Sequence, residues 1–298
     1  MADPSVKRKY LIPLCLLLAV LLAVGCVFFV RRLFPGKTLP PVPAPASGAL
    51  EVYLFDVGQG ESVLLRYPEG QTVLLDCGPE SAARSLADSL NRLGVKRIDT
   101  LLLSHSHTDH TGGLSYLLKK VKVGEVLLAG HPSYYGQIPD VLVRRGVKYG
   151  YVTSGGALPC SASVRAELFN PPGNTGAEDE NDLSAVIRFT CGETSLLFAG
   201  DAGYEAESRI LSLYPRARLR SDVLLVGHHG ASSSSSLSFL KAVSPKIACI
   251  SVGAVNDYGH PHAETLERLG LIGAEIHTTA REGTIHLRLD GSSVSVIK

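Results

Sequence analysis

The sequence Ser-His-Ser-His-Thr-Asp-His fills residues 104–110, directly after the apolar run at residues 98–103. Histidines two positions apart at a strand end can point the same way, and a following turn can bring Asp109 and His110 to a neighbouring point. Imidazole nitrogens and carboxylate oxygens without thiolate are ligands for zinc, manganese or iron. The stretch therefore predicts a metal site at a strand end, with ligands for two ions.

The composition is that of a globular protein, with 298 residues of which 45% are hydrophobic and 19% are charged. The formal net charge of +1 is unevenly distributed: residues 1–49 carry six Lys or Arg and one Asp, a balance of +5. The remainder carries 23 basic against 27 acidic residues, a balance of −4. A tight nucleic-acid binder normally has a basic footprint, so the acidic remainder argues against one.

Residues 10–30 form an unbroken apolar stretch without a charged side chain, and basic residues flank it on both sides. A helix needs this length to cross a bilayer, so we expect a single-pass transmembrane anchor. The Pro-rich segment after it predicts an extended spacer. The expected division of the chain is a short basic N-terminus at residues 1–9, the anchor at 10–30, a linker at 31–49 and one folded domain at 50–298.

An alternative to the anchor is a lipoprotein, because residues 22–26 resemble a lipobox that would place the lipid on Cys26. The apolar run continues to Val30, which favours an uncleaved anchor. Basic residues on both sides leave the positive-inside rule little contrast. We expect the chain in the cell membrane with its folded domain on the extracytoplasmic side.

Short apolar strands and amphipathic helices alternate after residue 50, which predicts mixed sheets flanked by helices. Strands are expected at residues 51–55, 62–66, 72–75, 100–103, 125–128, 163–169, 185–190, 195–198, 222–226 and 246–251, and near Ile276, Ile285 and Val294. Helices are expected at residues 81–93, 114–120, 204–213, 237–242 and 262–269. Four of the strands end in polar residues, and α/β folds place their chemistry at such strand ends.

The motif HxHxDH, formed by His105, His107, Asp109 and His110, resembles the signature of the metallo-β-lactamase superfamily. Within that superfamily the chain is most similar to the C-terminal lactamase-like domain of competence protein ComEC and its free-standing relatives. The further motifs that carry this similarity are DVGQGES at residues 56–62, LDCG at 75–78, NDLS at 181–184, AGD at 199–201, HHG at 228–230 and NDYGHP at 256–261. The resemblance implies an α/β fold, an αββα four-layer sandwich, here preceded by the single transmembrane helix. It does not extend to the many-helix channel part of ComEC.

Carried over to this chain, the resemblance implies two divalent metal ions, zinc or manganese. His105 and His107 would bind the first ion. The second ion would be bound by Asp109, His110 and His228, with Asp201 bridging the two ions. Asp76 would accept a hydrogen bond from a ligating imidazole and fix its orientation.

Other residues are expected around the ligands. His229 is a support or substrate contact, because successive residues on a strand point in opposite directions. His260 contacts a substrate phosphate or protonates the leaving oxygen, or else caps the helix expected near His262. Asp56 and Gln59 belong to the loop that would approach the substrate.

The chain departs from the family pattern at two places. Glu61 stands where the family usually has Asp. Many members also have a third histidine on the first ion, whereas His131 is the one histidine between the HxHxDH motif and Asp201. Ser184, Asn181 or a water molecule would then complete the first ion's ligands.

The leading hypothesis is a membrane-anchored metal-dependent hydrolase, a phosphodiesterase or nuclease that uses a hydroxide activated by two metal ions. Asp109, His229 and His260 are its expected catalytic residues. Alternatives are a cell-envelope phosphodiester hydrolase of the phosphorylcholine type, a β-lactam-cleaving enzyme and a non-catalytic binding module on the same fold. The expected partners are the membrane, through the N-terminal helix, and a phosphodiester substrate with DNA as one candidate. No protein partner is inferred.

Overall fold

The computed structural model of the chain describes residues 48–173 and 179–297. The segment predicted to anchor the chain, residues 10–30, lies outside these ranges, as does Cys26. Within the described ranges, no helix combines the length and the apolar character needed to span a bilayer.

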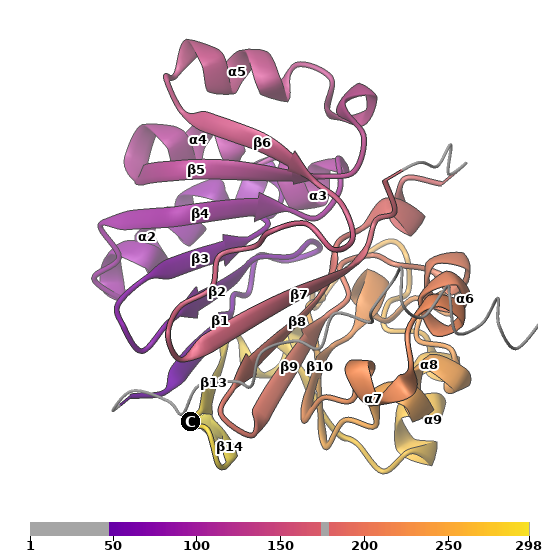
Figure 1. Ribbon diagram of the computed structural model, residues 1–298. Coiled ribbons are helices and arrows are strands. Elements are labelled where there is room, and N and C mark those ends of the chain that lie inside the picture. Colours follow the sequence, from indigo (N-terminus) through magenta and orange to yellow (C-terminus); the bar gives the residue numbers. More distant parts are fainter. Residues whose placement is uncertain (1–47, 174–178, 298) are drawn as a thin grey trace, which may run out of the picture. The chain divides into compact units, whose positions relative to one another are not determined.

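The described residues form two β-sheets (Figure 1). The larger sheet has eight strands in the order β14-β13-β1-β2-β3-β4-β5-β6, and the smaller has six in the order β12-β11-β10-β9-β8-β7. The strands of the larger sheet are β1 Leu50–Leu54, β2 Val63–Arg66, β3 Thr72–Leu75, β4 Arg97–Leu103, β5 Lys122–Ala129, β6 Lys148–Val152, β13 Ile285–Leu289 and β14 Val294–Ile297. Those of the smaller sheet are β7 Val164–Asn170, β8 Val186–Cys191, β9 Thr194–Phe198, β10 Val223–Leu225, β11 Ile247–Ile250 and β12 Glu275–Thr278.

Each sheet contains a set of parallel strands, and these strands determine where the polar residues after the strand ends lie. Strands β3, β4, β5 and β6 pair in parallel in the larger sheet. Strands β9, β10, β11 and β12 do so in the smaller one. The carboxyl ends of parallel strands lie at one edge of a sheet, so the residues that follow β3, β4, β9 and β10 are gathered at such edges.

Helices cover the outer faces of both sheets. The helices are α2 Ala83–Arg92, α3 Thr108–Thr111, α4 Leu114–Lys120, α5 Ile138–Arg144, α6 Tyr204–Leu213, α7 Arg216–Leu219, α8 Leu237–Val243, α9 Ala263–Leu271 and α10 Thr279–Glu282. Short 3₁₀ turns are η1 Glu80–Ala82, η2 Pro132–Tyr135, η3 Asn181–Leu183 and η4 Gly227–Gly230. Figure 1 shows α2, α4 and α5 with the larger sheet, and α6, α8 and α9 with the smaller one.

Three apolar clusters hold these four layers together. One lies between the sheets and joins residues such as Leu65 and Val52 with Phe189 and Leu225. A second packs α2, α4 and α5 on the larger sheet, and a third packs α6, α8 and α9 on the smaller. Because both faces of β9 are covered, all five of its residues, Thr194–Phe198, are buried, as expected for a strand in the middle of such a sandwich.

The predicted mixed α/β fold with two sheets is confirmed. The prediction missed α5 and β6, for which the sequence shows no clear apolar period, and also the one-turn helices α3, α7 and α10. In β6, Val152 is the only buried residue, because the strand lies at the edge of its sheet. Strand β10 is also shorter than expected, ending at Leu225 before the two histidines.

Candidate functional site

The candidate site is assembled from the segments that follow four strand ends. Asp76 directly follows β3, and the histidine-rich segment at residues 104–110 directly follows β4. Asp201 comes three residues after the end of β9, and the pair His228 and His229 follows β10. The sequence therefore supplies the site from loops that a rigid scaffold positions.

Asp76 is a buried carboxylate that orients the segment after β4. Its Oδ1 accepts a hydrogen bond from the Ser104 backbone N–H at 2.7 Å, and its Oδ2 accepts one from the Ser104 hydroxyl at 2.6 Å. The same Oδ2 lies 2.7 Å from Nδ1 of His110. Since a carboxylate accepts, Nδ1 carries a proton, and Nε2 is the nitrogen of His110 that faces the site.

Four side chains converge closely enough to hold one metal ion. One ligand atom from each of Asp109, His110, Asp201 and His229 lies within 4.8 Å of all the others. Nε2 of His229 is 3.2 Å from Oδ2 of Asp109, and Nε2 of His110 is 3.2 Å from Oδ1 of Asp201. Two imidazoles and two carboxylates are a donor set that zinc, manganese and iron accept.

Several buried polar atoms at the candidate site have no hydrogen-bond partner, as expected for ligands of a metal ion. His105 Nε2, His110 Nε2 and Asp201 Oδ1 are buried and have no hydrogen-bond partner. Leaving such atoms unpaired costs about 1–3 kcal/mol each, which bound cations would offset. Nε2 of His105 also lies 3.9 Å from Oδ2 of Asp201, so these three residues face a common space.

The pKa shifts of three residues suit metal ligands, whereas Asp201 and Asp76 outweigh burial and raise the pKa of His110 well above its usual value, so a metal ion would have to displace a proton from that ring. Burial, reinforced by the neighbouring His110, holds the pKa of His105 well below its usual value, so this imidazole is neutral. Burial alone would raise the pKa of Asp201, but His110 and His229 outweigh it and hold that pKa well below its usual value. The pKa of Asp109 is lowered to about 2 because its hydrogen bond to His229 and the charge of His110 outweigh the opposing effect of burial.

The structure corrects the strand argument that separated His228 from His229. Both residues lie after β10 in η4, with φ values of 52° and 53°, so strand alternation does not apply to them. His229 is buried and belongs to the group of four, whereas the His228 side chain is 25% exposed with Nε2 3.8 Å from Oδ2 of Asp201. Left-handed backbone is costly for residues other than glycine and asparagine, and such strain concentrates at functional sites.

His107 occupies a more open position than the other histidines of its motif. Its side chain is 43% exposed, and its ring centroid is 4.6 Å from that of His105. Nε2 of His107 lies 3.9 Å from Oε2 of Glu180, which also accepts a hydrogen bond from the Ser106 hydroxyl. Glu180 was not predicted as a site residue. It directly precedes the Asn181 motif, which was the available signal.

A cavity of about 540 Å³ opens onto these side chains. Its lining includes the predicted residues Gln59, His107, Asp109, Asp201, His228, His229 and His260. It also includes Asn181, which was predicted as one alternative ligand of the first ion, and residues that were not predicted as site residues, namely Ser106, Thr108, Tyr134, Glu180 and Tyr258. None of these lining residues is Lys or Arg, so the cavity itself offers imidazoles, hydroxyls and aromatic rings to a substrate.

His260 faces the cavity with a defined tautomer. The Gly253 N–H donates to Oε1 of Gln59 at 3.4 Å, which turns the Gln59 amide nitrogen toward Nδ1 of His260, also at 3.4 Å. Nδ1 of His260 is therefore the acceptor, and Nε2 carries the proton. Burial and the neighbouring imidazoles, His229 first, lower the pKa of His260 to about 4, so the ring is neutral at neutral pH.

Two other predicted residues shape the backbone around the site. Asp56 is exposed and accepts from the Gly58 N–H at 3.1 Å, which forms the turn that leads to Gln59. Ser184 is buried, and its hydroxyl accepts from the Asp201 N–H at 3.0 Å. Ser184 thus fixes the backbone of Asp201, while Asp56 does not line the cavity.

The loop after β1 approaches the ligands closely. A Cβ at Gly60 would lie 2.4 Å from the Asp109 carbonyl oxygen, so only glycine fits there. The next residue, Glu61, is buried with a carboxylate oxygen within 4.8 Å of ligand atoms of Asp76 and His110. Burial raises the pKa of Glu61 to about 8, so this carboxyl is protonated at neutral pH and adds no charge to the ligands.

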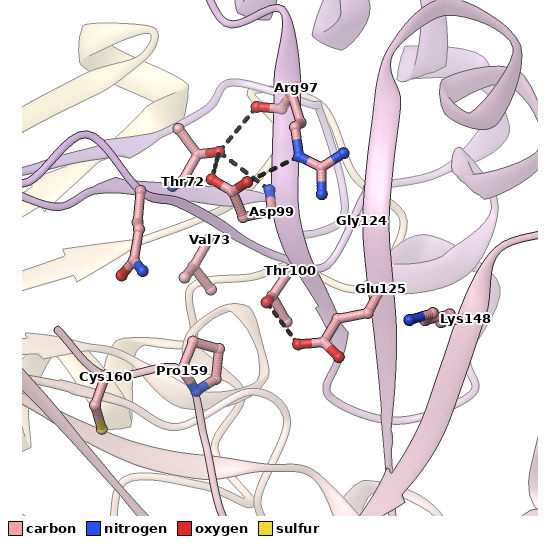
Figure 2. A pocket seen from close by; sticks show the side chains of 11 residues that line it. Thr72, Val73, Arg97, Asp99, Thr100, Gly124, Glu125, Lys148, Pro159 and Cys160 are labelled. Atoms are coloured by element: carbon pink, nitrogen blue, oxygen red, sulfur yellow. Dashed lines mark hydrogen bonds and ion pairs between the residues drawn. The ribbon is translucent and has the colours of Figure 1, made fainter.

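A second cavity, of about 390 Å³, lies at the other ends of the parallel strands, where β3 and β4 begin (Figure 2). Its polar groups are largely paired with one another. Asp99 accepts from Arg97 Nε at 2.9 Å and from the Thr72 N–H at 3.0 Å, and the Thr100 hydroxyl donates to Glu125 at 3.1 Å. These groups hold strands together, and we assign no chemistry to them.

The family model of the metallo-beta-lactamase superfamily matches residues 55–254. Competence protein ComA from Neisseria gonorrhoeae is 34% identical over 244 residues, which cover 82% of this chain and 33% of that protein. ComE operon protein 3 from Bacillus subtilis (strain 168) is 29% identical over 260 residues, covering 80% of this chain and 33% of that protein. The chain thus spans about a third of the length of these two relatives, and the predicted similarity to ComEC-type lactamase-like domains is confirmed.

Two further proteins are similar to this chain, one in part of its sequence and one in its fold. Endoribonuclease YSH1 from Gibberella zeae is 29% identical over 117 residues, covering 37% of this chain and 14% of that protein. Zn(2+)-bound PqqB from Methylobacterium extorquens, a solved structure, has a TM-score of 0.50 and 12% identity, covering 76% of this chain and 98% of that one. At that identity, the likeness to the solved structure shows the fold alone.

Proposed function

The chain belongs to the metallo-beta-lactamase superfamily, and we propose that it is a metal-dependent phosphodiesterase, with nucleic acid as its leading substrate class. The convergence of Asp109, His110, Asp201 and His229 at one edge of the sandwich carries this proposal. The unpaired buried atoms of His105, His110 and Asp201 give it further support. The names of the competence and endoribonuclease relatives support nucleic acid as the substrate class.

Two divalent ions held by these side chains would lower the pKa of water and neutralise charge on a phosphodiester. In the group of four, His110 and His229 each donate from Nδ1 to an acceptor, so each ring turns its Nε2 toward the site. Asp76 holds the proton on Nδ1 of His110, and the Ser251 carbonyl holds it on Nδ1 of His229. The His260 Nε2–H is available to donate to a phosphoryl or leaving oxygen in the cavity.

We also propose that residues 10–30 anchor the chain in the cell membrane with the folded domain outside. The apolar length of this segment supports the proposal. Alkaline carbonate extraction of membranes from expressing cells tests the anchor, because an integral protein stays in the pellet. Protease treatment of intact cells tests the orientation, since an external domain is degraded while cytoplasmic proteins survive.

The activity is tested with the purified full-length chain, stripped of metal and then supplied with Mn²⁺ or Zn²⁺. The substrates are single-stranded DNA, double-stranded DNA and bis(p-nitrophenyl) phosphate. The proposal expects cleavage that depends on added metal and is lost in Asp109→Ala. Absence of cleavage of all three substrates with either metal would contradict it.

The cavity lining favours one second candidate, a phosphorylcholine-type phosphodiesterase of the cell envelope. Tyr134 and Tyr258 line the cavity, which contains no Lys or Arg, and aromatic faces attract quaternary ammonium groups. Tyr258 is 66% exposed and stacks on His260 with ring centroids 5.5 Å apart. Hydrolysis of p-nitrophenyl phosphorylcholine at least tenfold faster than of bis(p-nitrophenyl) phosphate would favour this candidate over nucleic acid.

A further inference from the structure

The first metal position lacks the third histidine that the sequence pattern leads one to expect. In the structure, His131 is engaged locally, because its Nδ1 lies 2.8 Å from the Ser133 hydroxyl and 3.3 Å from the Ser133 N–H. His131 does not line the cavity. The third ligand therefore has to come from another residue or from solvent.

The two side chains considered from the sequence differ in what they can offer. The Ser184 hydroxyl is fully buried, is committed to the Asp201 N–H at 3.0 Å and does not line the cavity. Asn181 lines the cavity and has a buried Oδ1 without a hydrogen-bond partner. A neutral amide oxygen is a weaker ligand for a divalent ion than a carboxylate, so Asn181 is not the strongest candidate.

Glu180 has the charge that suits a divalent ion, and its carboxylate lies beside His107. It lines the cavity, and its Oε2 lies 3.9 Å from Nε2 of His107. Two atoms that each bind an ion at about 2.0–2.2 Å can be at most about 4.4 Å apart, so one ion can contact both. The Ser106 hydroxyl donates to the same carboxylate, which ties Glu180 to the histidine motif from which His107 comes.

We propose that Glu180 is the third protein ligand of the first metal ion, beside His105 and His107, with Asp201 shared between the two ions. This position would then have two imidazoles and two carboxylates instead of the three imidazoles of many superfamily members. Carboxylates suit manganese, whereas imidazoles suit zinc. Glu180 would thus shift the metal preference of this chain toward Mn²⁺. The inference rests on the proposed function only in requiring metal binding, not in requiring any particular substrate.

The test is a metal titration of the purified, metal-free full-length chain. Isothermal titration calorimetry gives the number and affinity of Mn²⁺ ions, and electron paramagnetic resonance distinguishes a spin-coupled Mn²⁺ pair from a single ion. Wild-type chain should bind two ions as a coupled pair. Glu180→Gln should lower the affinity for one of the two Mn²⁺ ions at least about tenfold, because even residues that only hydrogen-bond to a ligand contribute a factor of this size. The signal of the coupled pair should then be replaced by that of a single ion.

Two variants make the result specific. Glu180→His should restore two ions, with the ratio of Zn²⁺ to Mn²⁺ affinity at the weaker position raised at least about tenfold over wild type. Glu205→Gln removes an exposed carboxylate from the first turn of α6 and should titrate like wild type. Retention of one tightly bound ion by Glu180→Gln shows that the variant is folded.

Unchanged affinity for both ions in Glu180→Gln, or an equal loss of both, overturns the inference. A wild-type chain that binds two ions through Glu180 but cleaves no phosphodiester would leave the inference standing and contradict the proposed function alone.

Discussion

Nδ1 of His229 lies 2.9 Å from the carbonyl oxygen of Ser251, which directly follows β11. A carbonyl only accepts hydrogen bonds, so Nδ1 carries a proton, and Nε2, which faces Asp109 and Asp201, is the nitrogen that a metal ion would bind after displacing its proton. Strand β11 thus sets the orientation of a candidate ligand that the chain delivers after β10. No such partner of the His228 ring nitrogens is found among the described hydrogen bonds, and its side chain is more exposed.

This difference predicts distinct outcomes for the two neighbouring histidines. His229→Ala should lose about one metal ion per chain, because it removes a buried ligand atom from the group of four. His228→Ala should keep both ions and lower phosphodiester turnover. Elemental analysis of the two purified variants checks this. The assignment is wrong if His228→Ala loses an ion and His229→Ala does not.

Asp76 allows a test of whether a hydrogen bond to a candidate ligand, His110, strengthens metal binding. Asp76→Asn removes the negative charge that holds the Nδ1 proton of His110 and should weaken metal binding about 10–100-fold. Competition with a fluorescent chelator measures that affinity. Asp99→Asn is the matched control, because Asp99 accepts hydrogen bonds from Thr72 at the other end of the sheet. Equal metal affinity in the Asp76 variant and wild type would contradict the role of this hydrogen bond.

His260 is expected to act on the substrate without holding metal. His260→Ala should lower turnover of bis(p-nitrophenyl) phosphate by about 10²–10⁴-fold, the range for one proton-transfer group, at unchanged metal content. Gln59→Ala should lower turnover by less, because it frees the ring that Gln59 orients. Steady-state kinetics with parallel metal analysis tests both variants. Metal loss in His260→Ala would make His260 a ligand instead.

Glu207, which lies outside the candidate site, predicts how the free energy of unfolding depends on pH. It is buried in α6, and although it accepts from the Ser235 and Ser236 N–H groups, burial raises its pKa from 4.5 to about 7. Between these values the folded chain holds a proton that the unfolded chain has released. The free energy of unfolding should therefore fall as pH rises from about 4.5 to 7, by up to about 3 kcal/mol from this group.

Urea unfolding of the full-length chain at pH 5, 6, 7 and 8 measures this dependence. Glu207→Gln cannot ionise, so its free energy of unfolding should change less steeply with pH than that of wild type. The absolute stability of the variant is not the readout, because the amide changes the contacts to Ser235 and Ser236 at every pH. Parallel pH curves for the two chains would show that Glu207 does not titrate as proposed.

Elements with a strong apolar pattern were predictable from the sequence. The expected bounds of β3, α4 and α6 agree with the structure. Each has a continuous or periodic apolar pattern that burial on a sandwich layer requires. Edge strand β6 was missed because most of its residues are at least partly exposed, so its alternation is not visible in the sequence. The pairing that makes it a strand comes from β5, which is distant in sequence.

The residue types that gather at the candidate site could be read from the sequence, but their geometry could not. Three residues of the motif, His105, Asp109 and His110, do come together with Asp201. The choice between His228 and His229 depended on where β10 ends and on the left-handed backbone of both residues, and no sequence pattern signals either feature. Glu180 meets His107 because η3 brings its loop against the end of β4, and no periodicity signals such an approach.

The most direct test of the metallohydrolase account follows bis(p-nitrophenyl) phosphate turnover while the metal-free full-length chain is titrated with Mn²⁺. The account predicts no turnover without metal, a rise that reaches its plateau at two ions per chain, and no turnover at any metal concentration in Asp109→Ala. Turnover in the metal-free chain, or equal turnover by Asp109→Ala and wild type at saturating Mn²⁺, would contradict it.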